Sequence, residues 1–128
     1  MSHFSKIKTK LKDLTIIKKT LTDLKYSYTE GQNLQIDGYG SRTLGVDLAV
    51  RIGSGYEVGL KWNEAAGSYD LIADWYGVRT KPEKLMQNIM QRYAYHKVSS
   101  EIQKQGLMIS EESRLKDGSL KLVVRQWS

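Results

Sequence analysis

Three carboxylates in the middle of the chain are the first residues whose types and spacing could do chemistry. Asp70 and Asp74 lie four residues apart, and Glu57 lies in the alternating run before them. On neighbouring strands such a group could act in acid and base catalysis or bind a hard cation. Charged residues at alternate positions are also what the solvent-facing side of a hairpin carries, and we favour that interpretation. We therefore predict no catalytic residues and no metal ligands here.

Other reactive residue types are scarce. The chain has no cysteine and two histidines, His3 and His96, which excludes thiolate chemistry and leaves little for a metal. A pH-sensing or catalytic role is conceivable for His96, but a hydrogen-bonded histidine at the border of a helix's apolar face is the simpler interpretation. The run 38–41, Gly-Tyr-Gly-Ser, lacks the strand-to-helix setting of a phosphate-binding loop. We expect neither an enzyme nor a cofactor.

The aromatic residues are more informative, because the chain has eight tyrosines and three tryptophans. Trp62, Trp75 and Trp127 lie on predicted strands, where they could line one concave sheet face that binds a ligand or a partner. The alternative is that they pack beneath the helices. We expect two of the three in the core and one as an exposed anchor.

Positive charge is concentrated at the start of the chain. Residues 1–25 carry seven lysines and two aspartates, so they hold +5 of the formal net charge of +6. Such a region could attract RNA, DNA, an anionic membrane surface or an acidic protein. A solvated lysine face is the alternative, because Phe4 is the only aromatic residue before Tyr26 and base-stacking sites usually interleave aromatic and arginine side chains. The candidates for contact are Lys6, Lys8, Lys18 and Lys19.

Length and composition limit the organisation that can position these residues. The 128 residues and the hydrophobic fraction of 40% predict one domain over residues 1–128. No run approaches the roughly 18 apolar residues that a membrane span needs. The first residues are charged and alternating where a secretion signal has an apolar block, so we expect the protein to stay in the compartment where it is made.

Alternation and helical spacing place the elements of the first half. An edge strand is expected over about the first ten residues, followed by a helix from the N-cap Asp13 to about Lys25. Residues 32–45 are polar and glycine-rich, which predicts a loop or an irregular hairpin. The two alternating runs of 56–77 form a hairpin within a three-stranded antiparallel meander over about 47–77.

The second half begins with the sharpest local signal in the chain. Thr80 and Glu83 have the spacing of a capping box, with Pro82 in the first turn, so a helix is predicted over 81–105. Gly106 ends it, and two strands joined by a turn at 117–119 follow. The order β-α-β-β-β-β-α-β-β predicts an α+β fold in which two helices pack on one face of an antiparallel sheet. The shared plan of the two ends is compatible with a βαββ pseudo-duplication.

Several passages of the sequence resemble the hypothetical chloroplast reading frame thirty-five family. They are the start MSHFSKIKTK, residues 24–31, residues 67–75, and YAYHK at 93–97 leading to the Gln-Gly pair at 105–106. The resemblance spans nearly the whole chain and implies a protein of the cyanobacterial cytoplasm or the chloroplast stroma. The family has no established activity, so the resemblance implies no catalytic or ligand residues.

These observations predict a non-catalytic binding or assembly factor that recognises a protein partner in a photosynthetic cell. The prediction rests on the absence of a reactive constellation and on the excess of aromatic residues. The alternative is an RNA-binding or nucleic-acid-associated accessory protein that uses the basic N-terminal strand and helix. A carrier of a small ligand or cofactor is a third hypothesis.

Overall fold

The structure, a computed structural model, describes residues 3–126. Its centre is a five-stranded antiparallel sheet with the strand order β1-β5-β4-β3-β2. All six residues of β5 are buried, so both faces of this strand are covered. The predicted edge strand and the predicted meander are confirmed. The strands are β1 (Ser5–Lys8), β2 (Ser27–Asp37), β3 (Thr43–Arg51), β4 (Val58–Asn63) and β5 (Ser68–Ala73).

The hairpin of β4 and β5 folds as its alternating pattern predicts. Its register pairs Trp62 with Tyr69. In the turn, the side-chain oxygen of Asn63 accepts a hydrogen bond from the N–H of Ala66 at 3.1 Å. Gly67 completes the turn with a φ of 66°, a left-handed conformation that glycine adopts without strain.

The segment 32–45, predicted as a loop or an irregular hairpin, is the outer part of a long hairpin. β2 and β3 pair on both sides of a register shift between Glu30 and Leu34, and the short 3-10 turn η1 (Tyr39–Ser41) lies at the tip. Beyond the shift, the hairpin covers the sheet face that points away from the helices. A small second core forms there from Ile36, Val46 and Ala49, with Phe4, Leu34 and Leu44 packed against it.

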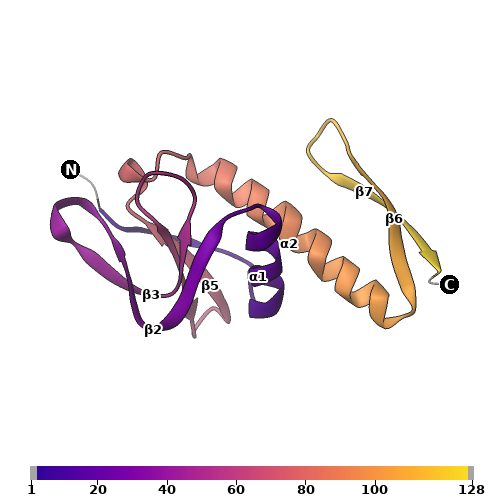
Figure 1. Ribbon diagram of the computed structural model, residues 1–128, viewed down its shortest axis with the longest axis horizontal. Coiled ribbons are helices and arrows are strands. Elements are labelled where there is room, and N and C mark those ends of the chain that lie inside the picture. The colour runs from indigo at the N-terminus through magenta and orange to yellow at the C-terminus, as the bar shows by residue number, and fades with distance from the viewer. Residues whose placement is uncertain (1–2, 127–128) are drawn as a thin grey trace.

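Both helices pack on the other face of the sheet, as predicted. α1 (Leu14–Asp23) begins at the predicted N-cap Asp13, whose carboxylate accepts a hydrogen bond from the N–H of Ile16 at 3.2 Å. α2 (Pro82–Lys104) lies beside α1 and the sheet (Figure 1). The main core includes Ile17 and Leu21 of α1, Leu85, Ile89 and Tyr93 of α2, and Leu48, Leu60 and Leu71 of the sheet.

The capping box predicted at Thr80 and Glu83 is wrong. The N-cap of α2 is Lys81, which makes no side-chain capping hydrogen bond, and Pro82 lies in the first turn. A residue before proline is held in extended conformation, so the helix begins one residue too late for Thr80 to cap it. At the other end, Gly106 has a φ of 76° and follows the helix as predicted.

The last two strands, β6 (Leu107–Arg114) and β7 (Leu120–Gln126), form a separate two-stranded sheet. α2 has 23 residues and is therefore about 35 Å long at about 1.5 Å per residue. It extends beyond the central sheet, and the hairpin then runs back along α2 (Figure 1). The α+β class and the order of elements are as predicted. The two βαββ halves nevertheless pair differently, because β2 and β3 join the central sheet whereas β6 and β7 do not.

Candidate functional site

α2 has two apolar faces: its fully buried residues lie on one of them, and the other packs only in part against the main core, through Met86 and Met90. Residues at intervals of four on the inner face are buried against α1 and the sheet: Leu85, Ile89 and Tyr93. A second row lies one residue further on, about 100° around the helix. It consists of Met90, Ala94 and Val98. The wide apolar stripe of the sequence therefore serves two different contacts.

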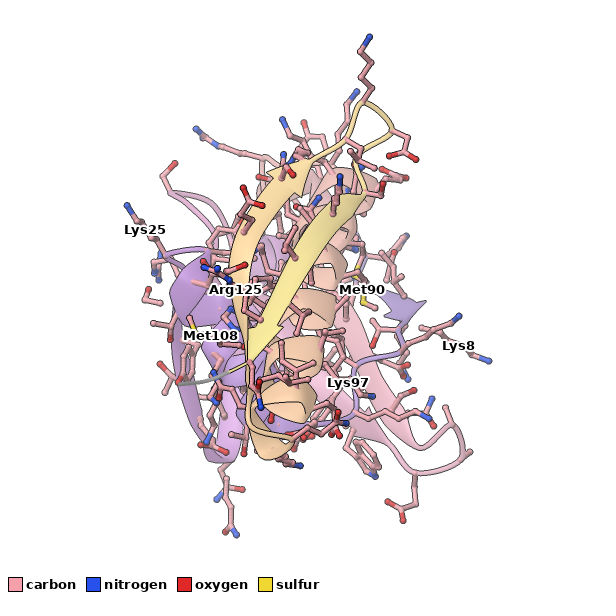
Figure 2. The ribbon with its side chains drawn as sticks, turned by 90° about the vertical axis from the view of Figure 1, so that its right-hand side faces the viewer. Lys8, Lys25, Met90, Lys97, Met108 and Arg125 are labelled. Atoms are coloured by element: carbon pink, nitrogen blue, oxygen red, sulfur yellow. The ribbon has the colours of Figure 1, made fainter. Side chains whose placement is uncertain are left out.

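The second face of α2 and the strand β7 enclose a groove of about 420 Å³, which we call the α2–β7 groove. Figure 2 shows the hairpin lying across α2, with Met90 beside it. β6 contributes no lining residue, so the groove lies on the side of β7 that has no strand neighbour. Its apolar and aromatic lining consists of Met90, Ala94, Tyr95, Val98, Leu120 and Leu122.

No residue of the hairpin is fully buried in its described part, 107–126. Val124 of β7 is 42% exposed, and so is Val98 on the facing helix. A two-stranded hairpin is marginally stable by itself and normally needs a third strand or a packed helix over its apolar face. The hairpin therefore keeps apolar surface that a binding partner could cover.

Polar side chains fix the hairpin to α2. Gln91 donates from Nε2 to the carbonyl oxygen of Gly118 at 2.5 Å. The same side chain accepts a hydrogen bond from Nη2 of Arg114 at 2.8 Å, and Arg92 forms an ion pair with Glu112. These contacts define where β7 lies relative to the helix and hence the shape of the groove.

A charged network links α1, α2 and β6 at the base of the hairpin. Oδ2 of Asp23 lies 2.7 Å from Nε of Arg92 and 2.8 Å from Nε2 of His96. Partial burial acts to raise the pKa of the Asp23 carboxyl, but the hydrogen bonds from Arg92 and His96 outweigh it and lower that pKa. His96 is thus a hydrogen-bonded histidine at the border of the helix, as the sequence favoured.

The outer face of β7 is basic. Lys121 and Arg125 alternate with the groove residues Leu120 and Leu122, so their side chains point to the opposite face of the strand. Lys97 of α2, labelled in Figure 2 with Arg125, is also exposed. Within residues 3–126 none of these three cations is paired with a carboxylate. Glu111 of β6, opposite Val123, lies on the same face as the two β7 cations. The edge of β7 therefore combines an apolar face with a face that carries two cations and one carboxylate.

The four lysines predicted as a contact surface are not gathered into one patch. Lys6 and Lys8 lie on β1, whereas Lys18 and Lys19 lie on α1. Lys18 pairs with Glu30 of β2 at 2.5 Å, and β1 and β2 are the opposite edges of the central sheet. Lys18 and Lys19 instead line a cleft between α1, β2 and α2.

The tryptophans do not share a sheet face either. The Trp62 side chain, on β4, is partly exposed to solvent. Its ring packs edge-to-face against Tyr69, with ring centroids 5.0 Å apart, and its Nε1 donates a hydrogen bond to Glu64 at 2.7 Å. Trp75 lies in the 3-10 segment η2 (Trp75–Gly77) and not on a strand, partly buried against the main core. These two are at opposite ends of the β4–β5 hairpin, and Trp127 lies outside the described residues.

The expectation that Asp70 and Asp74 face water is wrong, since they are 6% and 2% exposed. Asp70 accepts a hydrogen bond from Nδ2 of Asn63 at 3.1 Å, and Asp74 accepts one from the N–H of Tyr39 at 3.0 Å. Tyr39 belongs to the tip of the β2–β3 hairpin, which covers this part of the sheet. Over residues 3–126, no three metal-ligating side chains come together, and neither helix is long and apolar enough to cross a membrane.

Sequence reasoning missed the groove residues of β7 and the outer face of α2. The available signal was the width of the apolar stripe on the second helix, which exceeds what one buried face requires. It also missed Tyr39, Tyr56 and Tyr76, which three separate loops bring around one pocket. The high tyrosine content was the only hint of them.

Comparison with known proteins gives a family. Residues 20–123 match the family model described as protein of unknown function (DUF1257). The uncharacterized protein ycf35 of Guillardia theta is 31% identical over 99% of this chain and 98% of its own length. The ycf35 protein of Pyropia yezoensis is 32% identical over 100% of this chain and 99% of its own length. That of Cyanophora paradoxa is 32% identical over 99% of this chain and 98% of its own length. No solved structure matches the chain.

These matches confirm the resemblance found in the sequence. They cover both helices and all the strands of the central sheet, as well as the hairpin that forms the groove. The chain therefore belongs to the DUF1257 family of proteins of unknown function, together with the uncharacterized ycf35 proteins.

Proposed function

We propose that this chain is a non-catalytic binding or assembly factor that recognises another protein through the α2–β7 groove. The observation that carries the proposal is the exposure of the hairpin, in which no residue of 107–126 is fully buried although the first three residues of β6 and four of the seven residues of β7 are apolar. We propose the chloroplast stroma or the cyanobacterial cytoplasm as its setting; the ycf35 relatives, which come from algae, support a plastid.

The free edge of β7 defines the chemistry of the partner. An extended segment that adds to this edge as a third strand would place every second side chain over the groove and the others over the basic face. Apolar side chains suit the groove beside Leu122, and carboxylates suit the face of Lys121 and Arg125. The partner segment is therefore an extended strand in which apolar and acidic residues alternate.

A second copy of the chain fits this edge less well. Antiparallel pairing of β7 with itself about Val123 would place Lys121 of one copy opposite Arg125 of the other. Like charges directly opposite each other destabilise a sheet. The charge pattern therefore favours a different, acidic protein over self-association.

Site-specific photo-cross-linking tests the proposal. A benzoylphenylalanine at Ser119, which is exposed and lines the groove, is irradiated in an extract of the native plastid or cell. The same group at Ser113, on β6, is the control. Cross-links should form at position 119 and not at 113, and the cross-linked peptide should alternate apolar and acidic residues. A product that contains only a second copy, or no product, contradicts the proposal.

The identified segment, as a synthetic peptide, then provides a quantitative test with purified protein. Leu122→Asp places a carboxylate in the groove and should weaken binding at least tenfold, about 1.4 kcal/mol. Leu115→Asp is a matched control, because Leu115 is an exposed apolar residue of the same hairpin outside the groove. Equal affinities of the two variants would show that the peptide binds elsewhere.

A further inference from the structure

A second pocket, which shares no lining residue with the α2–β7 groove, is formed by three loops. It encloses about 560 Å³, within the range of small-molecule sites. Tyr39 comes from the tip of the β2–β3 hairpin, Tyr56 from the loop before β4, and Tyr76 and Arg79 from the segment after β5. We call it the tyrosine pocket.

The loops are locked together, so the pocket is formed without a ligand. The N–H of Tyr56 donates to the carbonyl oxygen of Gly77 at 2.8 Å. A Cβ at Gly55 would lie 2.1 Å from that same oxygen, and a Cβ at Gly77 would lie 2.1 Å from the Tyr56 ring, so only glycines allow this approach. The hydrogen bond from the N–H of Tyr39 to the buried Asp74 at 3.0 Å fixes the third loop.

Backbone conformation around the pocket is unusual as well. Arg79 has a φ of 66°, and Ser41, two residues after Tyr39 in the hairpin tip, also has a φ of 66°. Side-chain-bearing residues rarely adopt this left-handed region, and such strain concentrates at ligand-binding positions. Arg79 therefore lines the pocket in a backbone conformation that arginine rarely adopts.

The lining selects the ligand chemistry. Tyr76 is 88% exposed and Tyr39 is 60% exposed, so aromatic surface is open to solvent on the pocket. Arg79 is the only side chain of the lining with a full charge at neutral pH. Aromatic faces stack on planar rings, and a guanidinium binds a phosphate through paired hydrogen bonds. A planar ring joined to a phosphate satisfies both.

We infer that the tyrosine pocket binds a nucleotide, with its base against Tyr39 or Tyr76 and its phosphate on Arg79. The nucleotide is either free or one unit of a single strand, since both present the same base and phosphate. This site is separate from the α2–β7 groove, so the failure of either proposal leaves the other standing.

Titration with two kinds of probe tests the inference and separates the two sources. Adenosine and uridine monophosphates are added to ¹⁵N-labelled protein, and a fluorescent twelve-nucleotide single-stranded RNA is titrated by anisotropy. Either probe should shift the amide signals of Gly55 and Gly77. If the monophosphates saturate the pocket and the RNA binds with a dissociation constant no more than tenfold lower, the ligand is a free nucleotide. If the dissociation constant of the RNA is more than tenfold lower, the ligand is a unit of a single strand.

Variants keep the test specific. Tyr76→Ala removes a side chain that is almost fully exposed, and Arg79→Gly keeps the left-handed backbone. Each should weaken the binding of the preferred probe at least about fivefold. Lys104→Ala and Lys116→Ala, at exposed lysines that line neither pocket, are charge controls and should leave that binding within about twofold. Absence of binding by both probes, or equal losses in the pocket and control variants, overturns the inference.

Discussion

Gly59 shows how one missing side chain lets both faces of the central sheet be covered. A Cβ at this position would lie 2.3 Å from Cγ1 of Val46 and 3.2 Å from Cδ1 of Ile36. The outer part of the β2–β3 hairpin can cross the sheet only because that space is empty. Gly59→Ala should therefore lower the free energy of unfolding by about 1–3 kcal/mol, measured by urea denaturation.

Two further variants separate crowding from a general effect of alanine. Gly53→Ala has no atom within 4 Å of the added Cβ and should change stability by no more than about 0.5 kcal/mol. Val46→Ala in the Gly59→Ala background should recover part of the loss, since it removes the clashing methyl groups. Strict additivity of the two changes would contradict the crowding explanation.

Asp23 gives a prediction for the dependence of stability on pH. Its pKa is lowered in the folded protein by Arg92 and His96, against the effect of burial, relative to about 4 in the unfolded chain. The stabilising contribution is therefore present above about pH 4 and is lost as the pH falls through the folded-state pKa. Asp23→Asn should cost about 1 kcal/mol at pH 7.

The measurement is the free energy of unfolding of both proteins from pH 7 to pH 3. The difference between wild type and Asp23→Asn should shrink as the pH falls below about 4. Asp37→Asn, at an exposed carboxylate at the end of β2, is the control and should show no such convergence. A difference that persists unchanged at pH 3 would assign the effect to something other than the charge of Asp23.

At the scale of elements, α2 positions the start of α1 through one hydroxyl group. The Tyr93 oxygen accepts hydrogen bonds from the N–H groups of Lys12 at 3.2 Å and Asp13 at 3.1 Å, and its ring is buried. Tyr93→Phe leaves the ring packing intact and removes both acceptors. It should lower stability by about 1–3 kcal/mol, because two backbone donors lose their partner.

Hydrogen exchange localises this effect. The amides of Lys12 and Asp13 should exchange faster in Tyr93→Phe than in wild type under native conditions. Tyr95→Phe provides the matched control, since the described structure assigns no hydrogen bond to the Tyr95 hydroxyl. Unchanged exchange at Lys12 and Asp13 would mean that water or local rearrangement replaces the Tyr93 oxygen.

At the scale of the whole molecule, the sequence predicted what depends on local pattern. The N-cap Asp13, the β4–β5 hairpin and the order of elements all follow from alternation, helical spacing and turn residues within short segments. The burial of Asp74 did not follow, because its partner Tyr39 comes from a hairpin tip distant in sequence. That of Asp70 did not follow either, because it lies on β5 between Lys8 of β1 and Lys61 of β4, and β1 is distant in sequence. The groove could not be predicted either, because no local sequence pattern shows which apolar face of α2 holds the fully buried core residues.

We expect the molecule to have two parts of unequal stability. The central sheet and α1 share a buried core with the inner face of α2, whereas no residue of the hairpin is buried over 107–126. Native-state hydrogen exchange should give opening free energies for hairpin amides at least about 2 kcal/mol below those of β4 and β5. Low concentrations of urea should leave the hairpin values almost unchanged, because a local opening exposes little surface.

The comparison between strands carries the argument. β5 and β7 have six and seven residues, so a difference in exchange between them reports packing and not length. If the hairpin opens separately, its apolar strands are exposed often enough for a third strand to add at β7 without unfolding of the domain. If instead hairpin and β5 amides exchange with one common free energy and one common urea dependence, the hairpin unfolds together with the core. The edge of β7 is then a rigid surface, and a partner strand must fit it without a prior opening of the hairpin.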